Sequence, residues 1–147
     1  MFKGYTFGIT NGIVTMVSLI VGLYSTNVNK IGIIGAIIAM LISDPLADAY
    51  AIYSAENERE PKNAYKSFIS AFSSQVLIQL TILLIVIISP DILTAVYTSV
   101  ILGFITIIGW GIYNKKQHTD IMKNLFIISF IIAVTYFIDR SVYLNYK

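Results

Sequence analysis

Two acidic residues inside an otherwise apolar stretch are the residues of this chain best suited to chemistry. Asp44 and Asp48 lie within residues 31–60, which read IGIIGAIIAMLISDPLADAYAIYSAENERE. Because they are four residues apart, they share one face of a helix. A carboxylate in the middle of a bilayer costs at least ~2.5 kcal/mol and usually faces a bundle interior or a water-filled path. No Lys or Arg falls inside an apolar stretch at the same depth, so we expect the pair to bind a cation or protons.

Neighbouring residues on the same helix extend this candidate site. Met40 lies one turn before Asp44, and Glu56 lies two turns after Asp48, so a thioether and a third carboxylate are expected on the same stripe. Pro45 cannot donate a backbone hydrogen bond, and it predicts a kink that loosens the backbone beside the two acids. Met40 also suits core packing, and Glu56 also suits a solvated helix end.

Neutral polar residues occur at the same spacing of four in two other apolar stretches. Asn11 and Thr15 are consistent either with oxygen ligands or with hydrogen bonds between helices. For Gln75 and Gln79 we favour hydrogen bonds between helices.

Two further patterns concern contacts between helices. Gly4, Gly8 and Gly12 form a small-residue face that permits close helix approach, and we predict that this face contacts a second copy of the chain. Asp139 and Arg140 are adjacent near the end of the last apolar stretch, where we expect them to form a pair.

The composition excludes a water-soluble globular protein. Of 147 residues, 56% are hydrophobic and only 12% are charged, and the mean hydropathy is +0.77. The net charge of +2, spread along the chain, gives no support for a nucleic-acid partner. There is no cysteine, so disulfides and thiolate ligands are excluded and a metal must use oxygen, methionine or His118. We expect no tightly bound cofactor.

Five apolar stretches are long enough to cross the ~30 Å hydrocarbon layer as helices. We place these spans at about 5–25, 31–53, 67–89, 92–113 and 121–143. The charged segment 56–66 contains Pro61, which predicts a helix break and a surface loop. The fold class is thus an all-α membrane protein with one five-span transmembrane domain over residues 1–147 and the lipid bilayer as its environment.

The distribution of basic residues predicts the orientation. With the N-terminus in the cytosol, seven of the ten Lys and Arg residues fall on the cytosolic side and three on the outer side. Because basic residues are enriched in cytoplasmic links, we expect the N-terminus in the cytosol and the C-terminus outside.

Three short motifs carry a resemblance to a known family. The run GITNGIVT at 8–15 resembles a GxxDGIVT signature, and SAENERE at 54–60 resembles the SxxxxxE half of EYxSxxxxxE. TYFIDR at 135–140 is similar to a last-span TYLIGR pattern. In this order they resemble the vacuolar iron transporter and calcium-sensitive cross-complementer family over the whole chain. The resemblance implies a homodimeric five-helix transporter that moves iron(II) or manganese(II) out of the cytosol in exchange for protons, along a path between the first and second helices of two protomers.

The chain departs from that family at the residues that bind metal. Asn11 stands where the family has an aspartate, and Asp44 and Asp48 are not the usual family ligands. Three more family residues, a methionine, a glutamate and a tyrosine, are replaced by Ala47, Ala51 and Ile52. The cytosolic metal-binding domain that some members carry is absent, because only the short link 55–66 joins the second and third spans.

These observations predict a transporter rather than an enzyme. We expect export of iron(II) or manganese(II) by proton exchange, across the cell membrane of a prokaryote or a vacuole-like membrane of a eukaryote. Two alternatives remain open: a non-transporting accessory membrane protein that kept the fold and lost the site, and an exchanger or channel for a monovalent cation.

Overall fold

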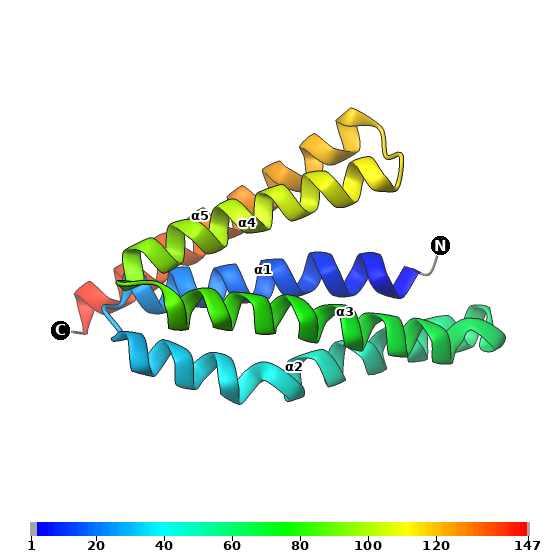
Figure 1. The fold of residues 1–147 in the computed structure, drawn as a ribbon, viewed down its shortest axis with the longest axis horizontal. Coiled ribbons are helices and arrows are strands. Elements are labelled where there is room, and N and C mark those ends of the chain that lie inside the picture. Colours follow the sequence, from blue (N-terminus) through cyan, green and yellow to red (C-terminus); the bar gives the residue numbers. More distant parts are fainter. Residues whose placement is uncertain (1–2, 147) are drawn as a thin grey trace.

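The computed structural model describes residues 3–146 and consists of five α-helices joined by short links (Figure 1). The helices are α1 (Lys3–Ser25), α2 (Lys30–Arg59), α3 (Pro61–Ile88), α4 (Ile92–Tyr113) and α5 (His118–Asn145). All five are long and apolar enough to cross a membrane, as a multi-pass membrane protein requires. The start of α1 and the end of α5 lie at opposite ends of the bundle, as five successive antiparallel helices require.

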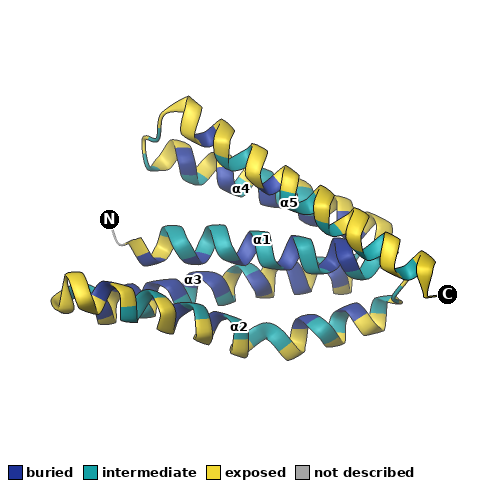
Figure 2. Ribbon diagram, turned by 180° about the vertical axis from the view of Figure 1, so that it is seen from behind, coloured by how far each residue is buried: buried dark blue, intermediate teal, exposed yellow. Residues whose placement is uncertain are grey.

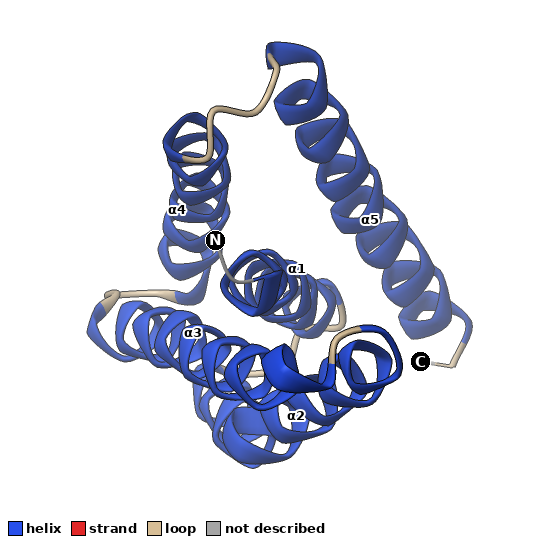
Figure 3. Ribbon diagram, turned by 90° about the vertical axis from the view of Figure 1, so that its right-hand side faces the viewer, coloured by secondary structure: helices blue, strands red, loops and turns tan. Residues whose placement is uncertain are grey.

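Helix α1 is the centre of the bundle and contacts the other four helices (Figure 3). α2 and α3 pack together on one side of it, and α4 and α5 lie on the other side. The fully buried core includes Ile13, Met16 and Ile20 of α1 with Ile33 and Ile37 of α2. The outward faces are exposed and apolar, as suits helices that meet lipid rather than water (Figure 2).

The glycine face of α1 packs against α3 of the same chain. A Cβ on Gly4 would overlap Ser70 Oγ, a Cβ on Gly8 would overlap Ser74 Oγ, and Gly12 lies against Gln75. All three glycines are buried. The prediction that this face contacts a second protomer is therefore wrong: the close approach that glycine permits joins two helices within one chain.

The predicted loop at 56–66 is also wrong, because helix continues on both sides of a single residue. α2 runs to Arg59, and α3 begins at Pro61, so only Glu60 is non-helical (φ −139°, ψ 76°). Proline is favoured at the first position of a helix and holds the preceding residue extended, so Pro61 starts α3 rather than opening a loop. At 1.5 Å per residue, α2 spans roughly 45 Å, and the tip of the α2–α3 hairpin therefore extends beyond a ~30 Å hydrocarbon layer.

Pro45 lies inside α2 and is buried, and the helix continues through it. Figure 1 shows α2 changing direction near the middle of its length, where its colour passes from cyan to teal. This agrees with the kink that the proline predicts.

A side-chain cap fixes the start of α4. Asp91 accepts hydrogen bonds from the backbone N–H and the hydroxyl of Thr94, both at 2.8 Å. These hydrogen bonds favour the ionised carboxylate and hold the pKa of Asp91 below its ordinary value of 3.8.

Candidate functional site

Asp44 and Asp48 meet three amide side chains from two neighbouring helices. Gln75 Nε2 donates to Asp44 Oδ2 at 2.9 Å and to Asp48 Oδ2 at 2.7 Å. Gln79 Nε2 donates to Asp44 Oδ2 at 2.9 Å, and Asn11 Nδ2 donates to Asp48 Oδ2. We call these five residues the amide–carboxylate cluster; it joins α1, α2 and α3.

Matched helical spacing produces this cluster. Asp44 and Asp48 occupy successive turns of α2, and Gln75 and Gln79 occupy successive turns of α3, the helix packed most extensively against α2. Because residues four apart lie one above the other, the two pairs face each other along the helix contact. Both glutamines are completely buried, so their amides are held in place by packing as well as by hydrogen bonds.

The cluster is rich in oxygen and poor in positive charge. Within residues 3–146, the hydrogen-bond partners of both carboxylates are amides, and no basic side chain is among them. The Oε1 atoms of Gln75 and Gln79 are buried without a hydrogen-bond partner. Rotation of each amide by half a turn would present these oxygens where the donors now lie.

A cation at this position would be held by two carboxylates together with neutral amide oxygens. In the part of the chain that the structure describes, no group of three or more His, Cys, Asp or Glu residues is placed to hold a metal. Two carboxylates with amide oxygens remain, a ligand set that suits oxygen-preferring cations such as manganese(II), magnesium or calcium.

The structure brings together three of the five residues predicted as ligands and separates the other two. Asn11, Asp44 and Asp48 belong to the cluster. Met40 lies one turn away, where it lines a cavity beside α1. Glu56 does not join them.

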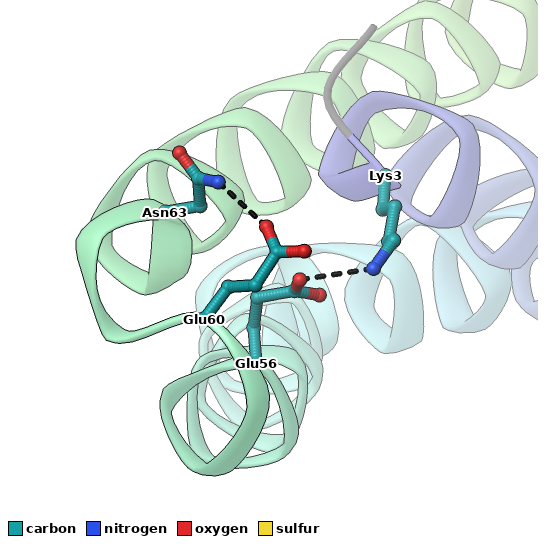
Figure 4. A network of polar contacts seen from close by, with 4 residues as sticks. All are labelled: Lys3, Glu56, Glu60 and Asn63. Carbon is teal, nitrogen blue, oxygen red and sulfur yellow. Dashed lines mark hydrogen bonds and ion pairs between the residues drawn. The ribbon is translucent and has the colours of Figure 1, made fainter.

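Glu56 forms an ion pair at the end of the bundle instead (Figure 4). Its Oε1 lies 3.0 Å from Lys3 Nζ, and the Glu56 side chain is only 8% exposed. Nearby, Asn63 donates to Glu60 at 2.7 Å and braces the turn between α2 and α3. The expected stripe of three carboxylates therefore does not converge, because Glu56 is about two turns from Asp48 and has a basic partner of its own.

The sequence predicts hydrogen bonds between helices for Gln75 and Gln79, and the structure confirms them. It also shows that the contact is made to Asp44 and Asp48, so that the glutamines belong to the site. The signal available in the sequence was the shared spacing of four in two apolar stretches that follow each other along the chain.

Two cavities lie along α1, one beside its N-terminal half and one beside its C-terminal half. The N-side cavity, of about 540 Å³, is lined by α1, α5 and the link before α5: Thr6, Phe7, Thr10, Asn11, Val14, Lys116, Asn124 and Ile131. The C-side cavity, of about 440 Å³, is lined by α1, α2 and α5: Thr15, Ser18, Leu19, Gly22, Leu23, Thr26, Met40, Thr135 and Asp139. Asn11 borders the first cavity, while Met40, one turn from Asp44, borders the second.

The chain matches no family model, no curated protein and no solved structure. The resemblance to the vacuolar iron transporter family thus rests on the three short motifs alone. Within the first of them, Asn11 replaces the family aspartate and donates a hydrogen bond to Asp48.

Proposed function

We propose that this protein is a membrane transporter that exports manganese(II) or iron(II) from the cytosol in exchange for protons. The observation that carries the proposal is the pair Asp44 and Asp48, two carboxylates without a basic partner among residues 3–146. Acids inside a membrane without a basic counter-charge are neutralised by a cation or by protons.

Exchange follows from competition for the same oxygens. One divalent cation supplies the two positive charges that the two carboxylates need, and protonation supplies them in its absence. The amides of Asn11, Gln75 and Gln79 serve both states, because each carries an oxygen for the cation and an N–H group for a carboxylate. Oxygen ligands favour manganese(II) over the softer metals.

The proposed transporter has its N-terminus in the cytosol and acts as a homodimer. The glycine face of α1 is used inside the chain, so the second copy needs another surface. The exposed side of α2 offers small residues at every fourth position: Gly35, Ala39, Ser43, Ala47, Ala51 and Ala55. Small residues at this spacing allow two membrane helices to approach closely.

Transport by the purified protein in liposomes tests the site assignment. We expect Asp44→Asn and Asp48→Asn each to abolish manganese(II) uptake and the accompanying proton flux, because asparagine keeps the size but removes the charge. Asp120→Asn is the matched control, since Asp120 is exposed and pairs only loosely with Lys123 at 4.0 Å. Uptake at the normal rate by both site variants would refute the assignment.

One observation favours the accessory-protein alternative. Three amides already donate to the two carboxylates, so the cluster also works as a bond between α1, α2 and α3. Equilibrium binding separates the two functions: a transporter binds manganese(II) at the cluster, whereas a purely structural cluster binds none. A monovalent cation exchanger or channel would instead show sodium or potassium flux that manganese(II) does not inhibit.

A further inference from the structure

The C-side cavity contains a carboxylate of its own, on α5. Asp139 Oδ2 lies so close to α1 that a Cβ on Gly22 would overlap it. The expected pair with Arg140 does not form: the Arg140 guanidinium donates to the Ser25 carbonyl at 3.2 Å and lies 5.7 Å from the Tyr143 ring centre. Asp139 therefore faces the cavity with no hydrogen-bond or ion-pair partner among residues 3–146.

Hydroxyl groups line the same cavity as this carboxylate. Ser18 Oγ is buried and has no hydrogen-bond partner. Thr26 Oγ1 donates to the carbonyls of Gly22 and Leu23, at 3.3 and 3.0 Å, which leaves its lone pairs free to accept a cation. Thr135, one turn before Asp139 on α5, lines the same cavity.

This cavity begins about one helical turn from the amide–carboxylate cluster. Thr15 lies one turn from Asn11 and Met40 lies one turn from Asp44, and both line the cavity. A cation that left Asp44 past Met40 would enter a space of about 440 Å³ in which Asp139 is the one carboxylate among the lining residues.

We propose that Asp139, with the hydroxyls of Ser18 and Thr135, forms a second cation site at which the exported divalent cation stops between the cluster and the far side of the membrane. The proposal rests on the proposed function. One carboxylate with neutral hydroxyls binds a divalent cation more weakly than two carboxylates do, and a weaker second site is what release requires. Gly22 contributes to this site because the absence of a side chain leaves room for the Asp139 carboxylate to lie against α1.

Manganese(II) binding to the purified protein in detergent, followed by electron paramagnetic resonance, tests both sites. We expect the unaltered protein to bind one ion tightly and a second one weakly. Asp139→Asn should lower the affinity for the weakly bound ion by at least about tenfold and leave the affinity for the tightly bound ion unchanged. Asp44→Asn should abolish binding of the tight ion and leave the weak ion bound.

The outcomes separate the two proposals. One tight ion that Asp44→Asn removes and Asp139→Asn leaves, with no second ion, overturns the Asp139 site and keeps the cluster. A single ion that responds only to Asp139→Asn overturns the cluster assignment and keeps the Asp139 site. Absence of any bound manganese(II) overturns both.

Transport kinetics give a second readout. Asp139→Asn should lower the turnover of manganese(II) in liposomes with little change in the concentration for half-maximal rate, because entry at the cluster is untouched. Gly22→Ala should lower turnover as well, since its methyl group displaces the carboxylate. Gly109→Ala is the control, because nothing lies within 4 Å of a Cβ there. Equal effects of the two alanine substitutions, or unchanged turnover in Asp139→Asn, would overturn the site.

Discussion

Gln75 is the residue on which both aspartates depend. It donates to Asp44 and Asp48 through one amide group, whereas Gln79 donates to Asp44 alone. We expect Gln75→Leu to lower the free energy of unfolding by about 1 kcal/mol more than Gln79→Leu, the scale of one hydrogen bond between membrane helices. Thermal unfolding in detergent measures the difference, with manganese(II) binding as a parallel readout. Equal losses in the two variants would mean that the second donation of Gln75 contributes nothing.

The sequence revealed the acids of this site but not their setting. Asp44 and Asp48 stand out because charges are rare in apolar helices. Gln75 and Gln79 resemble any amide pair between membrane helices, and nothing in a one-dimensional pattern says which helix they face. Glu56 shares the helical face of the aspartates, yet Lys3, 53 residues away in the sequence, pairs with it. Such a partner follows only from the packing of α1 against α2.

At the scale of the helices, the contact between α1 and α3 depends on the absence of side chains. We expect Gly8→Ala to destabilise the protein by about 1 to 3 kcal/mol, the usual cost of overpacking, because its Cβ meets Ser74 Oγ and the Ala71 carbonyl. Gly35→Ala should be neutral or slightly stabilising, since Gly35 has nothing within 4 Å and alanine favours helix. Denaturation of the two variants in detergent micelles checks the contrast. A Gly8→Ala protein as stable as the Gly35→Ala protein would contradict the contact.

The positions of the helices were predictable and their ends were not. All five apolar stretches are helices, and the predicted span 92–113 has the same bounds as α4 in the structure. The hydrocarbon thickness sets the apolar length, but helices continue past it wherever capping and packing allow. Thus α3 begins at Pro61 instead of residue 67, and α5 begins at His118 instead of residue 121. Polarity at 56–66 marked the exit from the hydrocarbon layer, which is not the same as the end of a helix.

At the scale of the whole molecule, the lack of cysteine in the chain makes topology directly measurable. We expect Asn63→Cys, at the tip of the α2–α3 hairpin, to react with a membrane-impermeant thiol reagent only from the cytosolic side. Tyr146→Cys should react only from the other side. Labelling of both positions from one side would contradict the five crossings.

For the homodimer, Ala47→Cys should form a disulfide between two copies upon oxidation, which needs Cα atoms within about 7 Å. The absence of cross-linking along α2 would exclude this dimer face.

The central place of α1 has a consequence for how the protein is made. The glycine face of α1 and its Asn11 find their partners on α3 and α2. α1 is nevertheless the first of the five to leave the ribosome. At a synthesis rate of about 5–20 residues per second, roughly 3 to 13 seconds pass before residue 88 is complete. During that interval the surface of α1 that contacts α3 is uncovered, so the packing of α1 depends on chain not yet translated.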